Sequence, residues 1–117
     1  MKILIVDDES TIADILVESF EDEGIDAKAL YSGNQAIKYL ESNQVDLVLS
    51  DIKMPDGTGI DLLESLNANN KNTSLMFMTG YSEFSSVELV EKGAIKVFTK
   101  PIDFDRVIEE IVEFLQK

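Results

Sequence analysis

The stretch VDLVLSDIKMPDGTG, Val45–Gly59, contains an apolar run that ends at a carboxylate. Its first part, Asp46–Ser50, is almost continuously apolar, as expected of a parallel strand that is covered on both faces. Asp51 follows directly, and a loop rich in Pro and Gly comes next. Asp51 therefore either forms a turn or belongs to a site at the end of a buried strand.

The same alternation of short apolar runs with helical periodicity continues along residues 1–117 and predicts one α/β domain with a parallel sheet. Strands are predicted at Lys2–Val6, Ala27–Leu30, Asp46–Ser50, Leu75–Met78 and Lys96–Phe98. Five helices are predicted from apolar residues at helical spacing, namely Ile12, Ile15, Leu16 and Phe20; Ala36, Ile37 and Leu40; Ile60, Leu62, Leu63 and Leu66; the segment Phe84–Lys92; and Phe104, Val107, Ile108, Ile111 and Leu115. Gly24 and Gly93 would end the first and fourth helices, and the third should end at the polar stretch Asn67–Thr73.

Composition excludes several classes of function. The chain has 10 Lys and Arg against 23 Asp and Glu, a net charge of −13, so direct binding to nucleic acid is not expected. It has neither Cys nor His, which removes Ser-His-Asp and Cys-His catalysis and most zinc sites. The apolar run at the N-terminus is too short for a signal peptide or a membrane span, so we expect a cytoplasmic protein without membrane contact.

Polar residues follow four of the predicted strands. Asp7 and Asp8 follow the first, and Asp51, Thr79 and Lys100 follow the third, fourth and fifth. In a doubly wound parallel sheet these carboxyl ends lie at one edge, where ligands bind. A carboxylate cluster without His or Cys suits a hard cation such as Mg²⁺. With a Lys beside it, the arrangement predicts phosphoryl transfer, with Asp51 as the nucleophile.

Each of these residues also has a simpler explanation. The segment Asp7–Ser10, including Glu9, would cap the first helix, because acids and Ser favour helix N-termini, and Asp51 would be a turn former. Thr79 would begin a helix, and Lys100 would be a solvated charge before a proline. These explanations do not account for four strand ends that each supply one member of the same site, so the functional interpretation is favoured.

The motifs LIVDD, LVLSDIKMPDGTG, MTG and KVFTKP, in this order and spacing, resemble the receiver domain of bacterial two-component response regulators over the whole chain. The resemblance implies a flavodoxin-like fold of five strands in the order 2-1-3-4-5 and five helices, as in the chemotaxis regulator of this family. It implies that Asp51 accepts a phosphoryl group from phosphohistidine on a sensor histidine kinase or a histidine phosphotransfer protein. The imidazole must come from that partner, because this chain has no His.

The resemblance also implies roles for the surrounding residues. Asp8, Asp51 and the backbone carbonyl of Lys53 would hold Mg²⁺, and Asp7 would contact it through water. Thr79 and Lys100 would bind the phosphoryl group, and the Lys100–Pro101 peptide bond would be cis. The domain would catalyse its own phosphorylation and dephosphorylation without being a classical enzyme or needing an organic cofactor. A downstream protein or a fused output domain would bind the face formed by the fourth helix, fifth strand and fifth helix.

Four positions are expected to modulate this chemistry, one of them Pro101 through its peptide bond with the preceding lysine. Family members usually carry Tyr or Phe where this chain has Val97, and strand alternation should point the adjacent Phe98 to the opposite face, which puts the usual aromatic switch in doubt. Lys53 and Tyr81 occupy places from which family members control the attacking water. Both are bulky and neither carries a carboxylate or amide to orient water, so slow self-dephosphorylation is expected.

Two other classes of function share parts of this pattern. A flavodoxin-type cofactor binder would need a phosphate-cradling loop after the first strand, where this chain has the acidic segment Asp7–Ser10. A metal-dependent aspartyl phosphatase would need an acid two residues after the nucleophile, where this chain has Lys53.

Overall fold

Ten elements alternate along the chain in the computed structural model, which describes residues 1–69, 72–80 and 83–117. The strands are β1 (Lys2–Val6), β2 (Asp26–Leu30), β3 (Leu47–Asp51), β4 (Ser74–Thr79) and β5 (Lys96–Thr99). The helices are α1 (Ser10–Asp22), α2 (Gly33–Leu40), α3 (Gly59–Ala68), α4 (Ser86–Glu91) and α5 (Phe104–Leu115). All strand pairs are parallel, and the sheet order is β2-β1-β3-β4-β5, so the predicted order is confirmed.

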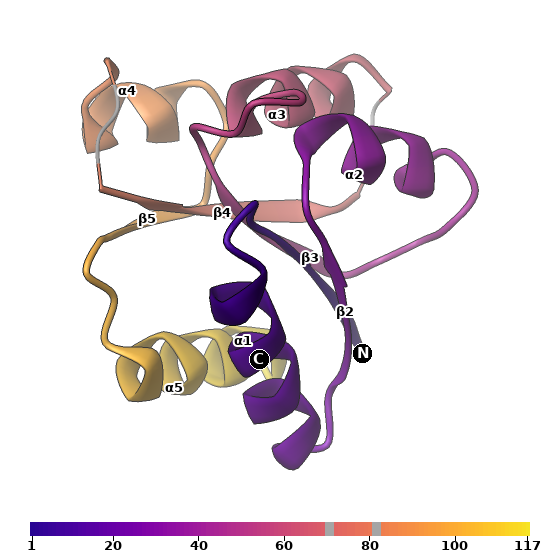
Figure 1. Cartoon of the computed structure of the whole chain (residues 1–117), viewed down its shortest axis with the longest axis vertical. Helices are drawn as coiled ribbons and strands as arrows, with labels where there is room; N and C mark the ends of the chain where they lie inside the picture. The colour runs from indigo at the N-terminus through magenta and orange to yellow at the C-terminus, as the bar shows by residue number, and fades with distance from the viewer. Residues whose placement is uncertain (70–71, 81–82) are drawn as a thin grey trace.

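The helices cover both faces of the sheet, with α1 and α5 on one side and α2, α3 and α4 on the other (Figure 1). Strand residues alternate between the two apolar layers that result. Ile3 and Ile5 of β1 pack in the layer under α1 and α5, whereas Leu4 and Val6 pack under the other three helices. Because β1 and β3 are buried on both faces, their sequences are almost continuously apolar.

Local side-chain bonds set two helix boundaries that periodicity did not predict. The fourth helix begins at Ser86 and not at Phe84, because Ser85 and Glu88 form a capping box in which each side chain accepts the other's backbone N–H. The third helix continues to Ala68, two residues into the polar stretch where it was expected to end. After it, the Asn69 side chain donates to the carbonyl of Ser65 and closes the last turn.

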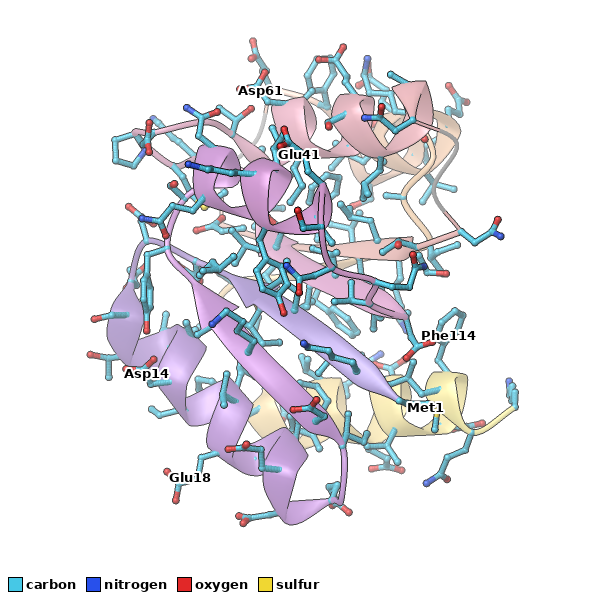
Figure 2. The ribbon with its side chains drawn as sticks, turned by 90° about the vertical axis from the view of Figure 1, so that its right-hand side faces the viewer. Met1, Asp14, Glu18, Glu41, Asp61 and Phe114 are labelled. Carbon is cyan, nitrogen blue, oxygen red and sulfur yellow. The ribbon has the colours of Figure 1, made fainter. Side chains whose placement is uncertain are left out.

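The first helix corrects one of the predicted core positions. Leu16 and Phe20 are fully buried as expected, but Ile15 is 43% exposed. Figure 2 shows Asp14 and Glu18 on the outer side of this helix, and both side chains are exposed. Within the described parts of the chain, every helix is too short or too polar to traverse a lipid bilayer.

The contrast between Phe20 and Ile15 can be tested by truncation. Phe20→Ala removes a side chain with no exposed surface and should lower the free energy of unfolding by about 3–5 kcal/mol, whereas Ile15→Ala should cost less than about 1 kcal/mol. Urea unfolding followed by far-UV circular dichroism measures both changes. Equal losses in the two variants would contradict the assignment of Ile15 to the exposed surface.

Candidate functional site

The carboxyl ends of the strands meet at one edge of the sheet. Three pairs in register define it, namely Val6 with Ser50, Asp51 with Met78, and Thr79 with Thr99. Asp7 therefore lies level with Asp51, one strand away. Lys100 follows β5, and its backbone N–H donates to the carbonyl of Thr79 over 2.8 Å. The structure thus brings together the residues that follow or end these strands.

Three carboxylates form the centre of this edge. Asp7, Asp8 and Asp51 each offer an oxygen, and these oxygens all lie within 4.8 Å of one another. Asp7 and Asp51 are buried, whereas Asp8 is exposed. Backbone N–H groups orient the buried pair, since Asp7 Oδ1 accepts from Glu9 at 2.9 Å and Asp51 Oδ1 accepts from Ile52 at 2.7 Å. In each residue the second oxygen, Oδ2, contacts Lys100.

Lys100 is the cation of the cluster. Its Nζ lies 2.9 Å from Asp51 Oδ2, 3.4 Å from Asp7 Oδ2 and 3.6 Å from Glu9 Oε1, and its side chain is 17% exposed. The simpler interpretation of Lys100 as a solvated charge is therefore wrong. The Lys100–Pro101 peptide bond is cis, as predicted.

Burial and charge act in opposite directions on the pKa values of this cluster. Burial raises the pKa of Asp7 above the usual value, and the N–H of Glu9 offsets this only in part. Burial also lowers the pKa of Lys100, but the hydrogen bond and charge of Asp51, with those of Asp7, outweigh it and leave the value raised. Lys100 is therefore charged at neutral pH, and its single positive charge faces several carboxylates.

The structure shows whether Glu9, the acid directly before α1, caps this helix. Glu9 is the N-cap residue of α1, but its side chain makes no capping hydrogen bond. Its carboxylate faces Lys100 instead. Sequence reasoning treated Glu9 only as a possible cap, and its contact with Lys100 was missed because the two residues are distant in the sequence.

The other predicted site residues occupy different surroundings. Thr79 ends β4 and is buried, Lys53 is exposed in the loop after Asp51, and Pro101 is exposed after β5. Val97 packs on the side of α4 and Phe98 packs on the side of α5, which confirms the predicted alternation. Tyr81 lies outside the described residues.

The donor set fits a hard divalent cation. Its atoms are carboxylate oxygens, which Mg²⁺ prefers, and the exposed Asp8 leaves the cluster accessible to an ion that retains water. The negative charge in excess of Lys100 would favour a cation thermodynamically. Asp7, Asp8 and Asp51 are therefore the side chains that could hold a metal.

Comparisons with known proteins agree with this geometry. The family model of the response regulator receiver domain matches residues 3–112. Sporulation initiation phosphotransferase F of Bacillus subtilis is 36% identical over 97% of this chain and 93% of its own length. By contrast, the chain spans 22% and 26% of two transcriptional regulators that it also matches.

Solved structures of response regulator proteins are similar to this chain over nearly its whole length. A response regulator receiver domain protein from Methanospirillum hungatei has a TM-score of 0.88 and 30% identity over 98% of this chain and 93% of that one. Response regulator protein TrrA from Thermotoga maritima, in complex with Mg²⁺ and BeF, has a TM-score of 0.82 and 29% identity over 96% of each chain.

Asp7→Asn is expected to raise the free energy of unfolding at pH 7 without divalent metal. Because burial raises the pKa of Asp7, wild-type stability falls as pH rises from the ordinary aspartate range through the raised value. The Asp7→Asn variant has no carboxyl group at this position and avoids this loss of stability. Its greater stability relative to wild type should disappear near pH 3, where the Asp7 carboxyl group of wild type is protonated in both the folded and the unfolded chain. Urea unfolding at both pH values measures the difference. Asp22→Asn, at the end of α1, is the control, and a less stable Asp7→Asn protein at pH 7 would contradict the interpretation.

Proposed function

Because this chain belongs to the response regulator receiver domain family of two-component systems, we propose that it accepts a phosphoryl group on Asp51. The donor is phosphohistidine on a sensor histidine kinase or a histidine phosphotransfer protein. The observation that carries the proposal is the carboxylate of Asp51, buried at the end of β3 and held 2.9 Å from the ammonium of Lys100. An aspartate that only formed a turn would need neither the burial nor the cation.

Two different contacts orient the two carboxylate oxygens of Asp51. The N–H of Ile52 fixes Oδ1, so that Oδ2 is presented on the side of Lys100. In the proposed reaction one carboxylate oxygen attacks phosphorus, the P–N bond breaks, and its electron pair returns to the donor imidazole. Lys100 then pairs with the charge on the phosphoryl oxygens, and the hydroxyl of Thr79 donates a hydrogen bond to one of them. The chain would thus catalyse its own phosphorylation. In dephosphorylation, water would attack phosphorus, the P–O bond to Asp51 would break, and inorganic phosphate would leave the free carboxylate behind.

The proposed cofactor is Mg²⁺. Asp8, Asp51 and the backbone carbonyl of Lys53 would hold it, with Asp7 acting through water. When bound, Mg²⁺ would neutralise charge on the phosphoryl oxygens, which is most of what this reaction requires. The all-oxygen cluster supports the assignment, as does the Mg²⁺ and BeF complex of the related TrrA protein.

The proposed output is a change at the face formed by α4, β5 and α5, which a downstream protein or a fused output domain would recognise. Three apolar side chains in and beside α4 support a partner there, since Val87, Val90 and Ile95 are 67%, 50% and 48% exposed. Val97 packs beneath the same helix in place of the family's usual aromatic residue. The signal would therefore pass through the packing of a β-branched side chain. We place this function in the cytoplasm, where two-component phosphotransfer occurs.

Asp51→Asn should abolish phosphate incorporation, because the amide removes the nucleophile while the shape of the side chain is kept. Incubation with acetyl phosphate and Mg²⁺, followed by intact mass measurement, should give an acid-labile adduct in wild type and no adduct in the variant. Asp22→Asn, which removes the same charge from the exposed end of α1, should label like wild type. Labelling of Asp51→Asn at the wild-type level would refute the assignment. Phosphate release by wild type without an adduct would favour the aspartyl phosphatase.

Mg²⁺ should stabilise the folded chain through the acidic cluster. At about one hundred times its Kd, free Mg²⁺ should add about 2.7 kcal/mol to the free energy of unfolding. Thermal unfolding should show a rise in Tm that is absent in Asp8→Ala, because that variant loses an exposed ligand. If Na⁺ at matched ionic strength raised the Tm equally, the effect would be only screening of the −13 charge.

A further inference from the structure

The carboxylate of Asp56 joins the loop between β3 and α3 to the start of α2. Its Oδ2 accepts from Ser32 Oγ and its Oδ1 accepts from Asn34 Nδ2, each over 3.0 Å. Ser32 is the N-cap residue of α2, and its oxygen also accepts the N–H of Gln35. Asp56 is therefore hydrogen-bonded to the N-cap residue of α2, which lies more than twenty positions earlier in the sequence.

Backbone contacts fix the same two segments in register. Gly33 N–H donates to Gly57 O over 2.9 Å, and Asn34 N–H donates to Asp56 O over 3.1 Å. There is no room for a side chain between them, since a Cβ on Gly33 would lie 2.4 Å from Gly57 O. The loop and the start of α2 thus form one rigid contact, which we call the Asp56 clamp (Ser32–Asn34 with Asp56 and Gly57).

Asp51 lies at the other end of the same loop, and the residues between are also anchored. Ile52 and Met54 are 6% and 4% exposed, and the carbonyl of Ile52 accepts the N–H of Gly59 over 2.8 Å. Lys53 lies between these two buried residues with its side chain exposed. Its backbone is therefore held on one side by the core and on the other by a loop that ends in the Asp56 clamp.

We propose that Asp56 is a positioning residue for the divalent cation, although it belongs neither to the carboxylate cluster nor to its contacts with Lys100. The clamp holds the loop so that the backbone carbonyl of Lys53 is oriented before the ion binds, which removes the cost of ordering the loop at that step. The inference rests on the proposed function, because it concerns the same metal site. Asp56 is exposed, so its truncation should alter the loop and leave the apolar core intact.

Removal of Asp56 could also weaken cation binding simply by removing a negative charge. Control variants separate this effect of charge from the loss of the Asp56 clamp. Asn34→Ala deletes one donor of the clamp and changes no charge. Glu64→Gln removes a charge from the exposed surface of α3 and leaves the clamp intact. The double variant Asp56→Ala with Asn34→Ala shows whether the two residues act through the same contact.

Isothermal titration with Mg²⁺ at fixed ionic strength measures the Kd, and urea unfolding without Mg²⁺ measures stability separately. Asp56→Ala should weaken Mg²⁺ binding about 3- to 10-fold, at or below the range for partners that directly orient ligands. Asn34→Ala should weaken it less, and the double variant should bind no more weakly than Asp56→Ala. A purely structural role would lower stability and leave the Kd unchanged.

The outcomes separate the two proposals. Wild-type protein that binds no Mg²⁺ would refute the metal site of the proposed function, and the positioning role with it. Mg²⁺ binding by wild type with an unchanged Kd in Asp56→Ala would overturn only the positioning role. An equal loss of affinity in Glu64→Gln would also overturn it, because general charge would then explain the effect.

Discussion

The contact between Lys100 and the carboxylates of Asp51 and Asp7 is the constraint on which the site depends. It joins the ends of three strands that are distant in the sequence, and it can form only at the edge where parallel strands all end. Burial raises the pKa of Asp7, the nearby charge of Asp51 raises it further, and the single ammonium of Lys100 does not offset them. The fold thus maintains an excess of negative charge that favours the binding of a cation, and this excess costs stability in the free domain.

Apolar periodicity was sufficient to predict the elements, because most strands and helices bury an apolar face. Among the elements that the structure describes, the exceptions are β2, which has no buried residue, and α4, in which only Leu89 is buried. The strand order came from the family resemblance, since periodicity does not specify neighbours in a sheet. The predicted helix boundaries were wrong where side chains form local hydrogen bonds with the backbone, as in the Ser85–Glu88 capping box. The expectation that Ile15 is buried was wrong for another reason, because periodicity does not reveal which part of an apolar stripe the neighbouring elements cover.

The main side chains of the candidate site could be predicted because they follow buried strands, where a charged residue stands out against apolar neighbours. Glu9 and Asp56 carry no such signal. Their partners, Lys100 and the pair Ser32 and Asn34, are far away in the sequence and become neighbours only through the topology of the sheet. In an acidic chain with 23 Asp and Glu, two more surface acids are indistinguishable until the tertiary structure places them.

The division of the core into two apolar layers has a consequence for how such a chain can change. The sheet separates the layer under α1 and α5 from the layer under α2, α3 and α4, and most of their side chains do not meet. Substitutions in different layers should therefore have nearly additive effects on stability. A lineage can repack the layer that holds Val97 while the layer under α1 and α5 keeps its packing. The sequences of the two layers can therefore diverge at separate rates within one small domain.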